Sequence, residues 1–177
     1  MLISPEYRAL NEKLHEDRDY GRGGKRWMNF IHRKLGPFRP FNGMVDMLDY
    51  GCGKGTLGKL MPFFIDEYDP CVPEKSARPE PHWYVICTDV LEHIEPECID
   101  DVLADLAYLT LGQALLVIAT RPANKCLPDG RNAHLIVEDE FWWKRKLAQH
   151  FTTLNRYHNV SQEGEFAVIV ESIHDHN

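Results

Sequence analysis

Residues 45–57 read Val45-Asp46-Met47-Leu48-Asp49-Tyr50-Gly51-Cys52-Gly53-Lys54-Gly55-Thr56-Leu57. An apolar run contains the acidic Asp49 near its end, and three glycines follow at alternate positions, Gly51, Gly53 and Gly55. Glycine takes a positive φ at little cost and lets a ligand approach the backbone closely. The pattern therefore predicts a buried parallel strand, a tight turn and a helix over residues 56–61, whose first amides face a ligand. The alternative is a tight turn between a strand and a helix that binds nothing.

Composition and length are those of one globular domain: 177 residues, 44% hydrophobic and 27% charged. No apolar run approaches the roughly 20 residues that span a membrane, and the first residues do not resemble a signal peptide. We therefore expect no membrane contact. The five cysteines are scattered and never spaced Cys-x-x-Cys, which favours a reducing compartment and a cytoplasmic location.

The net charge of −7 is unevenly distributed along the chain. Residues 1–41 carry +4, residues 42–120 carry −10 and residues 121–177 carry −1. A protein that coats a nucleic-acid duplex needs a basic face, so an acidic middle makes a duplex an unlikely partner. The spacing of apolar and basic residues before residue 42 predicts two amphipathic helices, one capped by Ser4-Pro5 and one that carries Trp27, Ile31 and Leu35 and ends at Gly36-Pro37.

Helices and strands are expected to alternate along the rest of the chain. Hydrophobic runs and helical periodicity predict strands over residues 63–68, 83–87 and 114–120, a helix over 99–112, a helix over 138–150 with Trp142 and Leu147 turned inward, and a closing β-hairpin of residues 153–160 and 166–173. Residues 70–82 contain four prolines, which exclude a regular helix or a central strand there. This order predicts an α/β fold.

Acidic residues follow the predicted strands, where open α/β sheets bind ligands. Asp69 ends the second strand, and a carboxylate at that position can accept both hydroxyl protons of a ribose. Asp66 and Glu67 are weaker alternatives, and a solvated turn is the competing interpretation. Asp89 follows the third strand in the same way.

Two histidines are candidates for a general base, because the pKa of histidine lies near neutral pH. His93 follows Glu92 shortly after the third strand, and His134 lies beyond the polar loop of residues 121–133. Each could equally be a hydrogen-bonded structural histidine. In the same loop Arg121, Lys125 and Arg131 could meet an anionic group, or could simply be solvated.

The glycine spacing resembles the first motif of class I S-adenosylmethionine-dependent methyltransferases. The block Cys87-Thr88-Asp89-Val90-Leu91-Glu92-His93-Ile94 looks like the fourth-strand motif of the small-molecule and RNA O-methyltransferases of that class. Tyr68-Asp69-Pro70 and Asn132-Ala133-His134-Leu135 complete four matches in the family's order, over residues 45–150. The resemblance implies a Rossmann-like three-layer α/β/α sandwich with a mostly parallel sheet and a C-terminal antiparallel hairpin. Family members place a further strand–helix unit where residues 70–82 lie, so we expect that unit to be missing, and the adenine contacts are not assigned.

The resemblance further implies methyl transfer from S-adenosylmethionine to a small polar acceptor, at oxygen. We expect a single domain over residues 1–177, with an N-terminal helical arm (1–41) and a Rossmann-like core (42–177). In the family, Tyr20 and Gly21 would belong to a loop that closes over the cofactor. The expected site residues are Asp49, Gly51, Gly53, Gly55, Asp69 and Asp89 at the cofactor, and Glu92, His93 and His134 as catalytic groups on the acceptor side.

A divalent metal is a further implication of the resemblance. In the small-RNA 2′-O-methyltransferases and the ubiquinone-pathway O-methyltransferases, residues corresponding to Glu92 and His93, joined in the RNA enzymes by one corresponding to His134, hold such an ion against the acceptor hydroxyls. Asp89 stands here in place of their first Glu, and the same pattern occurs in members without a metal. The alternatives are a protein that binds S-adenosylmethionine or S-adenosylhomocysteine without turnover and, less favoured by the glycine spacing, an NAD-dependent oxidoreductase.

Overall fold

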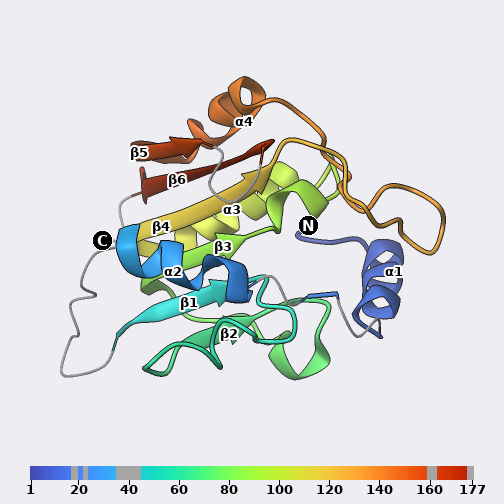
Figure 1. Ribbon diagram of the computed structural model, residues 1–177, viewed down its shortest axis with the longest axis horizontal. Helices are drawn as coiled ribbons and strands as arrows, with labels where there is room; N and C mark the ends of the chain where they lie inside the picture. Colours follow the sequence, from blue (N-terminus) through green and yellow to red (C-terminus); the bar gives the residue numbers. More distant parts are fainter. Residues whose placement is uncertain (17–19, 22–23, 35–44, 159–162, 175–177) are drawn as a thin grey trace.

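The computed structural model contains one six-stranded sheet with helices on both faces (Figure 1). It describes residues 1–16, 20–21, 24–34, 45–158 and 163–174. The predicted helix end at Gly36-Pro37 and the predicted boundary between residues 41 and 42 lie outside these ranges. The elements are α1 (Pro5–Glu16), α2 (Gly24–Lys34), β1 (Met47–Tyr50), β2 (Asp66–Tyr68), the 3₁₀ turn η1 (Pro73–Lys75), β3 (His82–Thr88), the 3₁₀ turn η2 (Leu91–His93), α3 (Ile99–Leu109), β4 (Thr110–Ala119), α4 (Glu140–Leu147), β5 (Phe151–His158) and β6 (Glu165–Ser172).

The sheet has the strand order β2-β1-β3-β4-β6-β5. Strand β1 pairs in parallel with β2 and β3, and β3 pairs in parallel with β4. Strand β6 runs antiparallel to both β4 and β5. The predicted mostly parallel sheet with a C-terminal antiparallel hairpin is therefore confirmed. The chain leaves β1 toward β2 on one side and later returns to β3 on the other, so a crevice opens beyond the carboxyl ends of β1 and β3.

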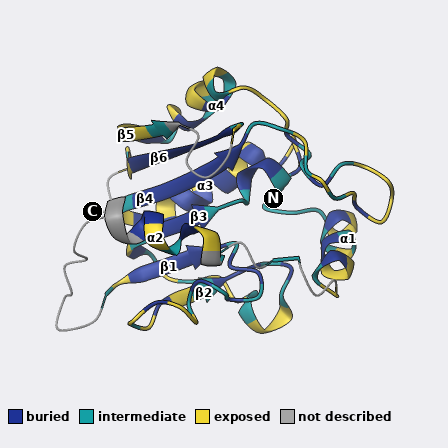
Figure 2. Ribbon diagram, in the orientation of Figure 1, coloured by how far each residue is buried: buried dark blue, intermediate teal, exposed yellow. Residues whose placement is uncertain are grey.

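Two apolar layers sandwich the sheet, because successive side chains of a strand point to opposite faces. On β4, Leu115 and Val117 pack with Trp27 of α2. Between them in sequence, Leu116 packs on the other face with the residues of α3 and α4. The four inner strands β1, β3, β4 and β6 are accordingly buried along most of their length, whereas the edge strands β2 and β5 are more exposed (Figure 2). This gives the three layers expected of the α/β/α sandwich.

The connection between β2 and β3 contains no further strand or α-helix. Residues 69–81 hold only η1, which begins at Pro73. Proline lacks the amide that a central strand or a helix interior requires. The prediction that one strand–helix unit is missing is therefore confirmed.

Several local predictions were wrong. The helix predicted over residues 99–112 ends at Leu109, and β4 begins at Thr110, ahead of the strand predicted over 114–120. Residues 56–61 form consecutive hydrogen-bonded turns in place of a helix, since only six residues separate Gly55 from Pro62 and proline restricts the residue before it. Strand β2 is shorter than predicted and begins at Asp66. In α4, Trp143 is buried together with Leu147, whereas Trp142 is only partly buried, because residues four apart share a helix face and residues five apart do not.

Helix α1 stands apart from the sheet, on the side to which the carboxyl ends of β1 and β3 point (Figure 1). Ser4 caps its first turn, as predicted, by accepting a hydrogen bond from the Tyr7 amide at 3.1 Å. The Tyr7 hydroxyl donates to the His93 carbonyl at 2.6 Å, and the Arg8 guanidinium donates to the Pro70 carbonyl at 2.8 Å. These bonds join α1 to the loops after β3 and β2. Among the described residues, no helix has the length and apolar character needed to cross a membrane.

Candidate functional site

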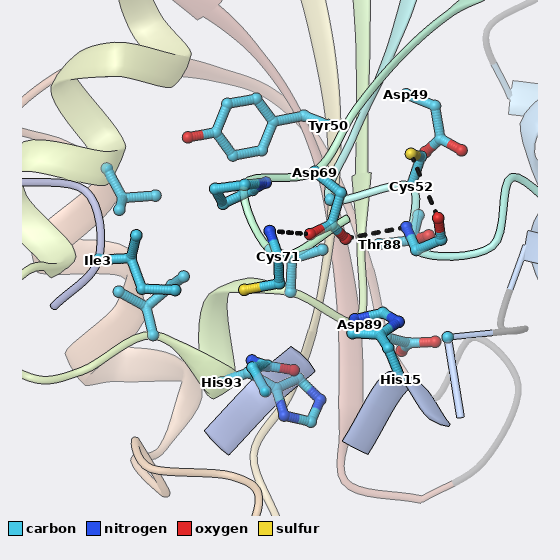
Figure 3. Close-up of a pocket in the computed structure, with 18 of the residues that line it drawn as sticks. Ile3, His15, Asp49, Tyr50, Cys52, Asp69, Cys71, Thr88, Asp89 and His93 are labelled. Atoms are coloured by element: carbon cyan, nitrogen blue, oxygen red, sulfur yellow. Dashed lines mark hydrogen bonds between the residues drawn. The ribbon is translucent and has the colours of Figure 1, made fainter. Parts of the chain in front are cut away.

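A cavity of about 270 Å³ opens where β1 and β3 end (Figure 3). The residues after these strands form one wall, and the N-terminal segment forms the other. The cavity therefore occupies the switch in strand order at which open α/β sheets bind ligands. Its lining includes five of the six predicted cofactor residues, namely Asp49, Gly51, Gly53, Asp69 and Asp89.

The turn after β1 depends on its glycines for both conformation and space. Gly51 has φ 75°, and a Cβ there would lie 2.4 Å from Cγ2 of Val90. Gly53 has φ 51°, and its Cβ would lie 2.8 Å from the Gly21 carbonyl oxygen. Side chains adopt this backbone region only at a cost and would also separate the three segments that meet here. The glycine motif thus permits the close packing of β1, β3 and the N-terminal arm.

The backbone amides of this turn are already paired within the protein. The Gly51 and Cys52 amides donate to the Tyr68 carbonyl at 2.7 and 3.1 Å, and the Lys54 amide donates to the Gly21 carbonyl at 3.0 Å. These amides therefore hold the turn together. The expected ligand-facing amides, at the start of a helix over residues 56–61, are not found, because that helix does not form and those residues do not line the cavity. Gly55 is not among the cavity residues and instead lies against the ion pair of Glu67 and Lys75.

Asp69 links the loops that follow β1 and β2. Its side chain is buried, and its two carboxylate oxygens accept hydrogen bonds from the Cys71 amide at 2.8 Å and the Gly53 amide at 3.0 Å (Figure 3). A carboxylate oxygen has a second lone pair, so each can still accept another donor. Asp69 is thus both a structural anchor of the cavity wall and an acceptor at its surface.

Asp49 contributes a second buried carboxyl to the cavity. Burial, with a smaller contribution from the charge of Glu67, raises its pKa to about 7. The group is therefore poised between its neutral and charged forms at neutral pH. A cation in the cavity would favour the charged form.

Asp89 is held by the second helix of the arm. Its carboxylate oxygens accept from the Arg26 guanidinium at 2.8 and 3.0 Å, and one of them also accepts from the Trp27 indole at 2.8 Å. Its φ of 57° lies in the left-handed region, which aspartate tolerates better than most residues and which is often found at functional sites. The sequence reasoning assigned Trp27 to packing alone and did not identify Arg26.

A second cavity of about 200 Å³ adjoins the first and shares Tyr20, Asp89 and His93 with it. The predicted catalytic residues Glu92, His93 and His134 all line this second cavity. The His93 and His134 rings meet edge to face with centroids 4.7 Å apart. The structure therefore brings together three groups that the sequence separates by up to 42 positions.

Both histidines present the same ring nitrogen to a backbone carbonyl. Nδ1 of His93 lies 2.7 Å from the Ala133 oxygen, and Nδ1 of His134 lies 2.6 Å from the Arg121 oxygen. A carbonyl only accepts, so Nδ1 carries the proton in each ring and Nε2 carries a lone pair. Burial and the neighbouring His134 lower the pKa of His93 to about 4, and burial lowers that of His134. Both rings are neutral acceptors at neutral pH.

Glu92 is fully buried beside these rings. One of its oxygens accepts from the Ala119 amide at 3.1 Å, and the other, Oε2, has no hydrogen-bond partner among the described residues. Burial and the nearby charge of Asp89 raise the pKa of Glu92 to about 8. One potential ligand atom from each of Glu92, His93 and His134 lies within 4.8 Å of the others, which is close enough for these residues to hold a metal ion.

The predicted cationic residues are only partly at the site. Arg121 and Lys125 line the second cavity, where Arg121 pairs with the buried Glu165 at 2.8 Å. Arg131 lines neither cavity and pairs with Asp129 on the surface. The Arg131 hypothesis is therefore not supported by its position.

Tyr20 and Gly21 line the first cavity, which agrees with their expected place near the cofactor. The sequence reasoning missed the contribution of α1, whose Tyr7, Asn11 and His15 also line it. Their spacing of four residues places them on one helix face, and two polar residues on a buried face were the available signal.

Comparison with known proteins finds no matching family model and no matching curated protein. Solved structures do match. Burkholderia thailandensis 1,6-didemethyltoxoflavin-N1-methyltransferase, solved with 1,6-didemethyltoxoflavin and S-adenosylhomocysteine, is 16% identical with a TM-score of 0.65, covering 97% of this chain and 92% of its own. The N-methyltransferase NodS from Bradyrhizobium japonicum WM9 is 14% identical with a TM-score of 0.62, and the match covers 97% of this chain and 100% of NodS. Magnesium protoporphyrin IX methyltransferase from Synechocystis PCC 6803 is 16% identical with a TM-score of 0.58, and the match covers 86% of this chain and 83% of that enzyme.

All three of these structures are methyltransferases solved with S-adenosylhomocysteine. The matches cover 86–97% of this chain, and sequence identities of 14–16% show a shared fold. The chain has the fold of the class I S-adenosylmethionine-dependent methyltransferases, as its glycine motif predicted.

Proposed function

We propose that the protein transfers a methyl group from S-adenosylmethionine to a small polar acceptor, at oxygen. The observation that carries this proposal is the pair of adjoining cavities, which share Tyr20, Asp89 and His93. The first has the carboxylates and the position of a donor site, and the second has the neutral bases of an acceptor site. The proposal places the enzyme in the cytoplasm, as its scattered cysteines predict.

The donor supplies an electrophilic methyl group on a positively charged sulfur. Asp49, Asp69 and Asp89 surround the first cavity with carboxylates, which favour a cationic ligand. Asp69 accepts the ribose hydroxyls with the lone pairs that its two amide bonds leave over. Gly51 and Gly53 also line this cavity, so that no side chain stands between the backbone of the turn and a bound donor.

The residues of the second cavity orient the acceptor and receive its proton. Nε2 of His93 or His134 accepts the hydrogen bond of an acceptor hydroxyl and aligns its oxygen with the methyl group in the neighbouring cavity. As the carbon–oxygen bond forms and the carbon–sulfur bond breaks, the hydroxyl proton passes to this nitrogen or to Glu92. Glu92 is the stronger base once it ionises near pH 8.

A divalent cation on Glu92, His93 and His134 is a second way to activate the hydroxyl. The observation that favours it is the close approach of three potential ligand atoms together with the unpaired Oε2 of Glu92. Two neutral imidazoles and a carboxylate suit a borderline metal such as Zn²⁺. Bound there, the ion would lower the pKa of an acceptor hydroxyl.

Incubation with methyl-labelled S-adenosylmethionine and pools of small hydroxylated and amino compounds tests this function. The proposal expects a labelled O-methyl product, and a chelator would abolish it only if the metal is required. A labelled N-methyl product would refute oxygen as the acceptor atom, and two of the similar structures are N-methyltransferases. Binding of S-adenosylmethionine and S-adenosylhomocysteine without any product would favour the inactive binding protein, and binding of NAD would favour the oxidoreductase.

A further inference from the structure

Helix α1 carries two buried polar side-chain atoms that have no hydrogen-bond partner within the described residues. Asn11 is only 8% exposed, and its Oδ1 has no partner. Nδ1 of His15, one turn further along, is likewise buried and has none. Both residues line the first cavity. Leaving such atoms unpaired is unfavourable, and buried polar atoms of this kind are usually paired in native proteins.

The position of α1 indicates which part of a ligand these atoms would meet. Arg8 ties the helix to the Pro70 carbonyl, next to Asp69, and Asn11 follows Arg8 by about one turn. At the other end of the helix, His15 lies against Gly21, which in turn packs on Gly53. The two residues that carry the unpaired atoms therefore line the cavity along the side on which Asp69 stands. Asp69 is the residue that we assign to the ribose.

The shortened connection between β2 and β3 gives this arrangement its significance. Residues 69–81 hold only η1 and no further strand–helix unit. Beside this connection, the cavity is bounded by Leu2, Ile3, Tyr7, Asn11 and His15 of the N-terminal segment. Leu2 and Ile3, ahead of α1, thus supply apolar surface on that side, and Asn11 and His15 of α1 supply the polar surface.

We infer that Asn11 and His15 bind the nucleoside part of the methyl donor, so that α1 replaces the missing unit as a recognition element. This inference rests on the proposed function. Oδ1 of Asn11 accepts a hydrogen bond from an amino or hydroxyl group of the nucleoside. Burial lowers the pKa of His15, so its neutral ring can donate through one nitrogen and accept through the other.

The test compares Asn11→Leu with the wild type by calorimetric titration and thermal unfolding. The ligands are S-adenosylmethionine and 5′-methylthioadenosine, which keeps the nucleoside and lacks the amino-acid part. Loss of one buried hydrogen bond to a ligand predicts an affinity about tenfold weaker for both. Because leucine has no unpaired polar atom, the unliganded variant should unfold at the same or a higher temperature. Lys13→Leu, on the exposed side of α1, is the matched control and should change neither affinity.

Three other results for Asn11→Leu would overturn the inference, and one result for the wild type would refute the proposed function. Unchanged affinity of Asn11→Leu for both ligands would overturn the inference. A loss confined to S-adenosylmethionine would place Asn11 at the amino-acid part and overturn the nucleoside assignment. A lower unfolding temperature, repeated in the smaller Asn11→Ala, would make Asn11 a structural residue and overturn the inference as well. A wild type that binds neither ligand would refute the proposed function itself, which is distinct from failure of the variant.

Discussion

Replacing Asp69 with alanine should weaken both the fold and donor binding. The carboxylate accepts two backbone hydrogen bonds, at 2.8 Å from Cys71 and 3.0 Å from Gly53, in a buried position. Hydrogen bonds to charged groups contribute about 1.5–3 kcal/mol each. Because the neighbouring cavity gives water partial access to the freed amides, we expect the free energy of unfolding to fall by about 2–4 kcal/mol in total.

The same substitution removes the proposed acceptor of the ribose hydroxyls. Loss of a charged partner predicts an affinity for S-adenosylmethionine weaker by roughly 1.5–3 kcal/mol, or about 10- to 150-fold. Urea unfolding followed by the fluorescence of the four tryptophans measures the first effect, and calorimetric titration measures the second. Asp69→Asn is the matched control. It keeps the shape and one acceptor oxygen, and should lose about half as much stability. An Asp69→Ala variant as stable as the wild type would refute the anchoring role, and an unchanged affinity would refute the ribose assignment.

Other predictions concern the two buried acids and the glycine turn. Glu92 is protonated in the fold up to about pH 8, so its contribution to stability is full below the unfolded pKa near 4.5 and is lost as the pH rises through 8. Glu92→Gln should therefore flatten the fall in melting temperature between pH 5 and 8.5. An unaltered fall would contradict the raised pKa of Glu92. Donor binding near pH 6.5 should release protons from Asp49, detectable as buffer-dependent heats that Asp49→Asn abolishes and that vanish in the wild type near pH 8.5. Gly51→Ala should destabilise the protein more than Gly130→Ala, which has a similar positive φ of 90° and open space, because only the former meets Val90; equal losses in urea unfolding would refute the close approach.

Local pattern was enough to predict much of the fold. The run that ends at the Gly51 turn, the aromatic strand over residues 83–87 and the two strands of the C-terminal hairpin depend on hydrophobic alternation and turn residues, which act over a few positions. The proline-rich residues 70–82 likewise indicated the missing unit, since proline is excluded from helix interiors and central strands.

Features that depend on contacts between distant segments could not be predicted in this way. The bond of Arg26 to Asp89 spans 63 positions, and that of Tyr7 to the His93 carbonyl spans 86. Neither has a local signature, so the contacts that α1 and α2 make at the two cavities emerged only from the structure, whereas the place of Tyr20 and Gly21 near the first cavity was expected. The pairing of the Gly51 and Cys52 amides with Tyr68 is of the same kind, because it depends on how β2 lies beside β1.

Calorimetric titration of the purified protein with S-adenosylmethionine tests the central claim most directly. The account predicts saturable binding of one molecule per chain, with micromolar affinity, displaced by S-adenosylhomocysteine and weakened by Asp69→Ala. A chelator should leave this binding unchanged, since the potential metal ligands lie in the second cavity. Absence of binding at millimolar ligand, from a protein that unfolds cooperatively, would contradict the assignment of the cavity and with it the proposed methyl transfer.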